Sequence, residues 1–323
     1  MASPSGPGQR IILTSVAAWA GATVNAVNSA PTATATVRIL RKRIFPLSIR
    51  FMITRFFNWS NTAGDRSRPV AQNYSMVPRC QGLEGGHLDN FSVSKALRVD
   101  QFTALKGGLV VSCQAPTGTA IDTPAFISAQ AQTVVQAGAV GIRAQGIENV
   151  RAIKKLVGVP VIGLVKRYLD TSAVYITPLL DDVLELEQAG AEIVAIDATQ
   201  RLRPNGVTFE RFMEQIREKT DLAILADVDS IESALLAQSL GCDAIATTLS
   251  GYTEIAAPEL PNLKLVAELV AKLKIPVVAE GGYHKREQVA QAFKVGAWTV
   301  CVGTAITNPY LLTQHFVNGI LES

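Results

Sequence analysis

The stretch Ala189-Gly-Ala-Glu-Ile-Val-Ala-Ile-Asp197 joins a helix-ending glycine to a short apolar run that closes on an acidic residue. Glycine ends a helix well because it adopts the left-handed conformation at little cost. A similar order, with an apolar run soon after the glycine, recurs at Gly138, Gly241 and Gly296. This repeat of helix, glycine and buried strand predicts βα units around a parallel sheet.

Apolar runs of this kind occur eight times in the second part of the chain, with helical stretches between them. They are residues 108–112, 140–143, 161–165, 193–196, 223–226, 244–247, 277–279 and 299–302. Nearly continuous apolar strands are typical of a barrel wall that helices surround. We therefore predict an α/β fold, a TIM (β/α)8 barrel. A doubly wound open sheet is the alternative, but no Gly-x-Gly-x-x-Gly follows the first run.

The first 64 residues differ from the rest, with seven basic and no acidic residues. Without them the formal net charge of the chain changes from +3 to −4, because 23 basic residues then stand against 27 acidic ones. We therefore expect a largely disordered leader and linker over residues 1–95 and a catalytic barrel over residues 96–323. The leader is interpreted as a targeting segment or as an extension from a misplaced start, with Met52 and Met76 as alternative starts.

The composition of the leader indicates neither a membrane-spanning helix nor a nucleic-acid-binding site. Its apolar stretch, residues 11–24, is shorter than the roughly 20 apolar residues of a spanning helix. Its basic residues are not interleaved with stacking aromatic side chains. We expect a cytoplasmic protein, with targeting by the leader as the alternative.

Four cysteines and three histidines show no metal-ligand spacing,. The cysteines are interpreted as small buried residues in a reducing compartment. No metal or other cofactor is expected.

Polar residues follow nearly every apolar run, at the strand ends where TIM barrels carry their chemistry. They include Ser112, Gln114, Arg143, Lys166, Arg167, Asp197, Asp227, Thr248, Glu280 and Thr304. Such a ring of charges would be partly desolvated and would have to pair, which indicates an active site. The alternative is a set of ion pairs that closes the barrel, and this alternative is strongest for Arg143 with Asp197.

Two glycine-containing segments follow the last two runs, namely Glu280-Gly281-Gly282 and Gly303-Thr304-Ala305-Ile306. Barrels often bind phosphate there through backbone N–H groups, which glycine leaves accessible. The alternative is that these glycines only turn the chain.

Several motifs then carry a family resemblance. They are Gly108-Leu-Val-Val-Ser-Cys-Gln114, Gly141-Ile-Arg-Ala144, Pro160-Val-Ile-Gly-Leu-Val-Lys-Arg167, Tyr175-Ile-Thr-Pro178, Ala195-Ile-Asp-Ala-Thr199, Val278-Ala-Glu-Gly281 and Val302-Gly-Thr-Ala-Ile-Thr307. In this order they resemble the N-acylmannosamine-6-phosphate 2-epimerases, from about Leu105 to the C-terminus. The leader has no counterpart in that family.

The resemblance implies an isomerase that interconverts N-acetylmannosamine 6-phosphate and N-acetylglucosamine 6-phosphate in sialic acid catabolism. It implies Lys166 as the base at carbon 2 and Glu280 as the complementary acid or base. It assigns sugar contacts to Gln114, Arg143 and Asp197, with Arg203 as a candidate for closing over the phosphate. The two glycine-containing segments add Gly281, Gly282, Gly303 and Thr304 as the expected phosphate-binding residues. The expected partner is a small phosphosugar, and a homodimer is compatible with the fold.

Three other functions stay open on the residues alone. A lysine at a strand end could form a Schiff base, as in an aldolase. The barrel could also bind a sugar phosphate without catalysis. A metal-dependent pentose-phosphate 3-epimerase would need paired His and Asp ligands, and the barrel region lacks the histidines. The sequence also leaves open which group removes the proton and which returns it.

Overall fold

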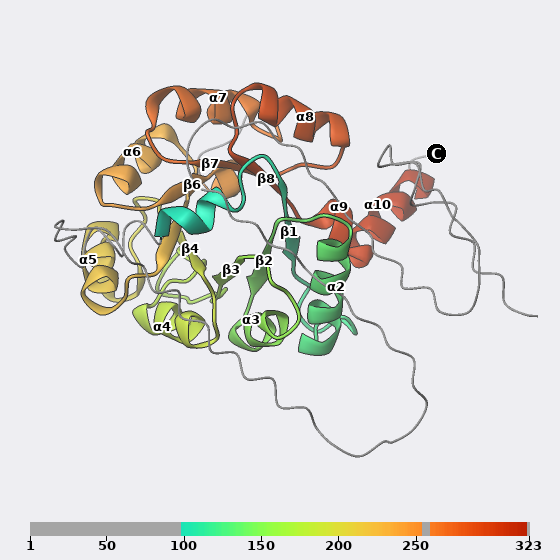
Figure 1. Cartoon of the computed structure of the whole chain (residues 1–323), viewed down its shortest axis with the longest axis horizontal. Coiled ribbons are helices and arrows are strands. Elements are labelled where there is room, and N and C mark those ends of the chain that lie inside the picture. The colour runs from blue at the N-terminus through green and yellow to red at the C-terminus, as the bar shows by residue number, and fades with distance from the viewer. Residues whose placement is uncertain (1–97, 254–258, 322–323) are drawn as a thin grey trace, which may run out of the picture. The chain divides into compact units, whose positions relative to one another are not determined.

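The computed structural model describes residues 98–253 and 259–321, so the expected leader and linker lie outside it. The described residues form a closed barrel of eight parallel strands in sequence order (Figure 1). The strands are β1 (Leu109–Cys113), β2 (Gly141–Gln145), β3 (Val161–Leu164), β4 (Ile193–Asp197), β5 (Ala223–Asp227), β6 (Ala244–Ala246), β7 (Val277–Glu280) and β8 (Thr299–Val302). β1 pairs with β8 and closes the ring. The predicted TIM barrel is confirmed.

Helices surround the barrel and connect its strands (Figure 1). They are α2 (Pro124–Gln136), α3 (Ile147–Lys154), α4 (Leu180–Gln188), α5 (Phe209–Lys219), α6 (Ile231–Ser239), α7 (Leu263–Lys272), α8 (Arg286–Lys294), α9 (Thr304–Thr307) and α10 (Pro309–Leu321). Two 3-10 turns, η2 (Pro204–Gly206) and η3 (Thr247–Leu249), follow β4 and β6. Gly138, Gly190, Gly241 and Gly296 all have positive φ values, between 82° and 110°, where a helix gives way to a strand,.

The core has two layers because side chains alternate along each strand. Outward residues such as Val194 and Ile196 pack against the helices, while inward residues such as Ile193 and Leu225 fill the barrel. Phe102 and Leu105, which precede β1, are buried in the inner cluster. The barrel is thus a packed core and leaves its chemistry to the loops after the strands.

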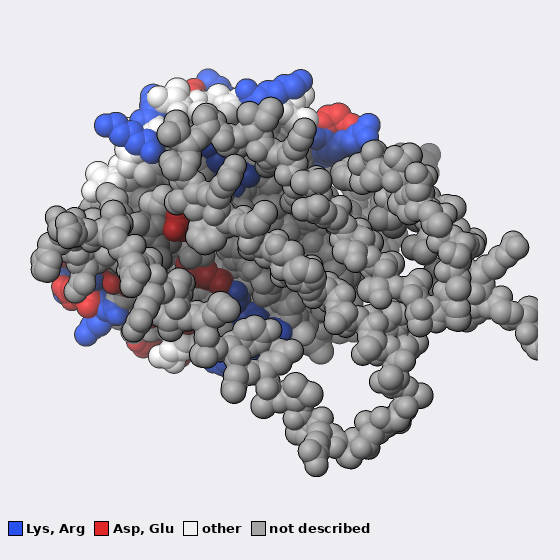
Figure 2. Space-filling model, in the orientation of Figure 1, with Lys and Arg blue, Asp and Glu red and all other residues white. Residues whose placement is uncertain are grey.

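Charged side chains lie on the outer surface of the helices. Lys and Arg are visible along the upper edge of the molecule, where α7 and α8 lie (Figures 1 and 2). In contrast, α10 contains no charged residue, and its Phe316 side chain is 73% exposed. Among the described residues, no helix has the length and apolar character that a membrane span requires.

The cysteines that the structure describes are Cys113, Cys242 and Cys301, and all three are buried free thiols. The interpretation as small buried residues is confirmed for these three. Cys80 lies outside the described residues.

Candidate active site

A cavity of about 440 Å³ lies at the C-terminal ends of the strands. This volume is within the range of small-molecule sites. Most of the predicted site residues line it, namely Gln114, Arg143, Lys166, Glu280, Gly281, Gly282, Gly303 and Thr304. The strands β1, β2, β3, β7 and β8 therefore bring together residues that are up to 190 positions apart in the sequence.

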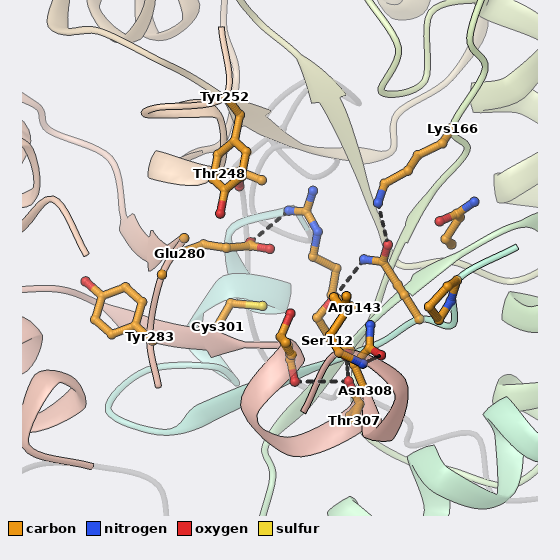
Figure 3. Close-up of a pocket in the computed structure, with 18 of the residues that line it drawn as sticks. Ser112, Arg143, Lys166, Thr248, Tyr252, Glu280, Tyr283, Cys301, Thr307 and Asn308 are labelled. Atoms are coloured by element: carbon orange, nitrogen blue, oxygen red, sulfur yellow. Dashed lines mark hydrogen bonds and ion pairs between the residues drawn. The ribbon is translucent and has the colours of Figure 1, made fainter. Parts of the chain in front are cut away.

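Lys166 stands directly after β3 and points into this cavity (Figure 3). Its backbone is fixed by an antiparallel bridge to Ile176, and the adjacent Arg167 N–H donates to the Tyr175 carbonyl at 2.9 Å. The Lys166 Nζ donates to Gln114 Oε1 at 2.8 Å. Gln114 Nε2 in turn donates to Ser112 Oγ at 2.8 Å, so one amine N–H has a defined direction.

Glu280 ends β7, and its backbone is held by Thr247 in the η3 turn that follows β6. Its N–H donates to Thr247 Oγ1 at 3.0 Å, while the same hydroxyl donates to the Glu280 carbonyl at 2.8 Å. Its carboxylate accepts a hydrogen bond from Arg143 Nη1 at 3.0 Å. Figure 3 shows Glu280 and Lys166 on opposite sides of the Arg143 guanidinium.

Arg143 is fully buried and pairs with Asp227 at the end of β5. Its Nη1 and Nη2 donate to the two Asp227 oxygens at 2.9 and 2.6 Å. Thr248 Oγ1 also donates to Asp227 Oδ1, at 2.7 Å. A buried guanidinium needs such a carboxylate, because an unpaired charge in the interior is costly.

The two expected proton-transfer groups have pKa values shifted toward each other. Burial lowers the pKa of Lys166, and the nearby positive charge of Arg143 lowers it further. Burial raises the pKa of Glu280, against the opposing effect of Arg143. These shifts favour a neutral amine and a protonated carboxyl, the forms that a base and an acid need for proton transfer.

The glycine segments after β7 and β8 form one side of the cavity. Gly281 and Gly282 have φ values of 106° and 74°, which side-chain-bearing residues rarely adopt,. Gly303 caps α9, and a Cβ at this position would lie 3.3 Å from the Ser112 Cβ. Here glycine brings the backbone of the two loops close to the cavity, as a phosphate site requires.

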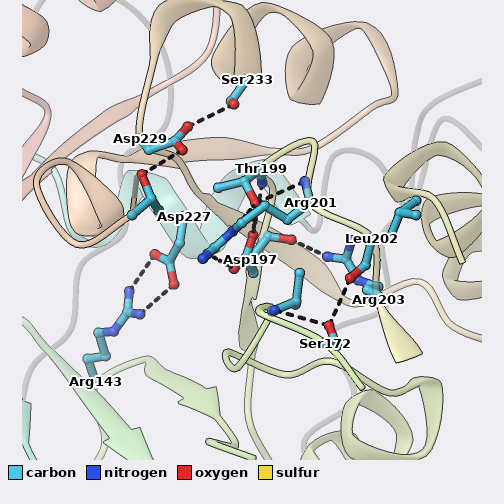
Figure 4. A network of polar contacts seen from close by, with 12 residues as sticks. Arg143, Ser172, Asp197, Thr199, Arg201, Leu202, Arg203, Asp227, Asp229 and Ser233 are labelled. Atoms are coloured by element: carbon cyan, nitrogen blue, oxygen red, sulfur yellow. Dashed lines mark hydrogen bonds and ion pairs between the residues drawn. The ribbon is translucent and has the colours of Figure 1, made fainter. Parts of the chain in front are cut away.

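Asp197 and Arg203, which were also expected in the site, are not among the residues that line the cavity. Asp197 accepts from Arg201 Nη2 at 2.7 Å and from Thr199 Oγ1 at 2.7 Å (Figure 4). The hypothesis of an ion pair between Arg143 and Asp197 is therefore wrong, since each of the two residues has a different partner. Asp197 and Asp227 both stand at strand ends, and the closure of the barrel decides which of the two faces Arg143.

Arg203 was expected to close over the phosphate, and its position does not support that role. The side chain is 1% exposed, and its Nη2 donates to the Asp197 carbonyl. Its guanidinium carbon lies 4.2 Å from the centre of the Phe212 ring and 5.3 Å from that of Phe209. This geometry indicates a structural cation–π contact behind the site.

Asp227 and Thr248 follow apolar runs in the sequence, but that pattern gives neither of them a role. The residues that line the cavity without having been predicted include Tyr175, Cys301, Thr307 and Asn308. The inward alternation of β8 could have indicated Cys301, which is two residues before Gly303. Tyr175 follows β3 by a longer connection, and no local pattern predicts that this connection turns back over Lys166. Among the described residues, no cluster of His, Cys, Asp and Glu could hold a metal ion.

A family model described as "Putative N-acetylmannosamine-6-phosphate epimerase" matches residues 127–322, more than half of the chain. The chain belongs to the N-acetylmannosamine-6-phosphate epimerase family. As a member of this family it is an isomerase. The matched span includes every strand from β2 onward, with Arg143, Lys166 and Glu280.

Individual members of the N-acetylmannosamine-6-phosphate epimerase family agree with this assignment. A protein of Caldanaerobacter subterraneus subsp. tengcongensis is 43% identical over 229 residues, which cover 70% of this chain and 96% of the relative. A protein of Salmonella arizonae is 48% identical over 210 residues, 65% of this chain and 90% of the relative. Both are named "Putative N-acetylmannosamine-6-phosphate 2-epimerase".

A solved structure extends the likeness to three dimensions. The N-acetylmannosamine-6-phosphate 2-epimerase of Clostridium perfringens aligns with a TM-score of 0.64 and 34% identity. The alignment covers 73% of this chain and 99% of that chain. The barrel of this chain thus corresponds to the full length of the clostridial enzyme.

Proposed function

We propose that this isomerase interconverts N-acetylmannosamine 6-phosphate and N-acetylglucosamine 6-phosphate, the 2-epimerase reaction of sialic acid catabolism. The observation that carries the proposal is that Lys166 and Glu280 line the same cavity. Burial lowers the pKa of Lys166 and raises that of Glu280, the directions that favour a neutral base and a protonated acid,. The names of the relatives supply the substrate.

The reaction breaks one bond, between carbon 2 and its hydrogen. In the open-chain sugar this carbon lies next to the carbonyl, so the electron pair of the C–H bond moves into an enolate. Lys166 accepts the proton as a neutral amine. One of its N–H groups donates to Gln114, and its lone pair stays free to bind the proton of carbon 2,.

Epimerisation is complete when a proton returns to the opposite face of carbon 2. Glu280 supplies this proton from its carboxyl and becomes a carboxylate beside Arg143, whose positive charge stabilises it. The position of Glu280 across the guanidinium from Lys166 suits delivery to the other face (Figure 3). The reverse reaction uses the same two groups with their roles exchanged.

The other site residues bind and orient the sugar. Gln114 accepts a hydrogen bond from Lys166, and Arg143 donates one to Glu280. Both also contact the polar atoms of the sugar near carbon 2. Gly281, Gly282, Gly303 and Thr304 offer backbone N–H groups to the 6-phosphate, as in other phosphate-binding barrels. The substrate thus lies across the cavity, with its phosphate at the β7–β8 side.

The experiment is an NMR assay of the purified protein with N-acetylmannosamine 6-phosphate in deuterated water. We expect the C2 epimer to appear with deuterium at carbon 2. The variant Lys166→Met should lose at least about 10³-fold in rate, as for the removal of a catalytic base. Lys155→Met, which changes an exposed lysine at the end of α3, is the matched control and should retain full activity.

The same experiment separates the epimerase from the alternatives. No epimer from a folded parent protein would contradict the proposal. Borohydride that traps an adduct on Lys166 with the substrate would instead support a Schiff-base aldolase. Binding of the phosphosugar without exchange at carbon 2 would support a non-catalytic barrel.

We also propose that the chain forms a homodimer through α10. This helix has no charged side chain and exposes Phe316, Val317 and Ile320, which are 73%, 46% and 71% exposed. Exposed apolar surface of this kind favours association with a second copy. Light scattering should give twice the chain mass, and Phe316→Glu should give the monomer. The control Phe126→Glu, on α2, should stay dimeric, and a monomeric parent would contradict the proposal.

A further inference from the structure

Cys301 is a buried thiol in the active site that the proton transfer described above does not use. The register of the sheet places it directly opposite Glu280 on the neighbouring strand. Residues paired in this way in a parallel sheet project to the same side, here into the barrel. Cys301 is 2% exposed, yet it lines the same cavity as Glu280.

The thiol lies on the Glu280 side of the cavity (Figure 3). Its environment keeps the sulfur protonated, because burial and the adjacent Glu280 raise the pKa of Cys301 well above its ordinary value. A thiol in this state is a hydrogen-bond donor and a poor nucleophile. A hydrogen bond from the thiol to the Glu280 carboxylate would lower the pKa of Glu280 against the effect of burial, as would one from the Thr248 hydroxyl.

Other charged groups also face Glu280. They are Arg143 on β2, Asp227 on β5 and Lys166 after β3. Arg143 holds one oxygen of the carboxylate, Oε2, at 3.0 Å. A further donor on β8, in addition to Arg143 and the nearby Thr248 hydroxyl, would restrict the rotation of the carboxyl group,.

We propose that Cys301 is a positioning residue that donates its S–H hydrogen bond to the Glu280 carboxylate and holds it toward carbon 2 of the substrate. This inference rests on the proposed epimerase function. It assigns β8 a role in proton transfer in addition to the phosphate contacts of Gly303 and Thr304.

The test compares two variants of Cys301 with the parent by kcat, KM and pH profile. Cys301→Val keeps most of the side-chain volume and removes the donor, while Cys301→Ser keeps a donor. We expect Cys301→Val to lower kcat about 3- to 10-fold, the effect of one lost hydrogen bond, with KM changed less than about twofold. At least one limb of its pH profile should move to higher pH and neither to lower pH, because the carboxylate loses a donor. Cys301→Ser should restore kcat and the profile.

Cys242→Ala is the matched control. Cys242 is equally buried but lies in the outer layer, where its sulfur is 3.8 Å from that of Met213. This variant should leave kcat and the pH profile unchanged. Thermal unfolding of all variants shows how much of each effect is structural, and Cys301→Ser gives the decisive comparison if Cys301→Val does not fold.

Three outcomes would overturn the inference: equal kcat and pH profile in Cys301→Val and the parent, an effect on KM alone, or no restoration by serine. These outcomes presuppose an active parent. A parent that shows no exchange at carbon 2 would instead refute the proposed function itself, so the two failures are distinguishable.

Discussion

Arg143 and Asp227 form a two-point ion pair across the mouth of the barrel, with Nη1–Oδ1 and Nη2–Oδ2 distances of 2.9 and 2.6 Å. Both side chains are at most 1% exposed. Arg143 Nη1 also contacts Glu280, so the pair fixes the charge beside the group that we propose as the acid. Asp227 thereby belongs to the active site although it does not line the cavity.

The variant Asp227→Asn should lower the free energy of unfolding by about 3 kcal/mol, since it removes the buried two-point counter-charge of Arg143 and leaves Glu280 as the remaining acidic contact,. Urea unfolding measures the change. The control Glu214→Gln removes the partner of Arg211 from an exposed pair and should cost less than about 1 kcal/mol,. An equal loss in free energy of unfolding for the two variants would show that burial does not make the Arg143–Asp227 pair more important for stability than an exposed pair.

The pH profile of kcat/KM should be bell-shaped in both directions of the reaction. The Lys166–Glu280 pair is active when it holds one proton, because one group must accept and the other must donate. At low pH both groups are protonated, and at high pH both have lost their protons. The lowered pKa of Lys166 and the raised pKa of Glu280 place the two limbs closer together than ordinary lysine and glutamate would. A single sigmoid profile would contradict this arrangement.

Lys166→Met should abolish activity and also stabilise the fold at neutral pH. Because the folded pKa of Lys166 is lowered, the folded state binds fewer protons than the unfolded state, and stability rises with pH in this window,. Methionine removes that cost. The gain in melting temperature should shrink as the pH approaches the ordinary lysine value of about 10.4. A melting temperature below that of the parent at pH 7 would refute the prediction.

Gly282→Ala should destabilise the protein more than Gly206→Ala. Both glycines have positive φ values, 74° and 70°, so alanine at either costs roughly 1–2 kcal/mol of backbone strain,. At Gly282 the new Cβ would also lie 2.6 Å from the Leu260 Cβ, whereas Gly206 has no atom within 4 Å. Thermal unfolding compares the two, and steady-state kinetics should show a raised KM for the phosphosugar only in Gly282→Ala. Equal KM values would argue against phosphate binding by this loop.

The fold, and the strand ends that line the cavity, could be predicted from the amino-acid sequence. The glycines after four of the helices and the β-branched runs are local signals, because backbone conformation and burial on two faces act within a few residues,. These signals are sufficient to predict that Lys166 and Glu280 stand on one rim of the barrel. The observed barrel has the strands at the expected positions.

Which of the rim residues contact one another could not be predicted, because it depends on the three-dimensional fold. Arg143 pairs with Asp227 and not with Asp197, and Arg203 packs on Phe212 behind the cavity. Cys301, which the sequence presents as one more apolar strand residue, stands opposite Glu280. Distances across the barrel depend on how eight strands close and on their register. Since these follow from packing of the whole chain, no local pattern in the sequence encodes them.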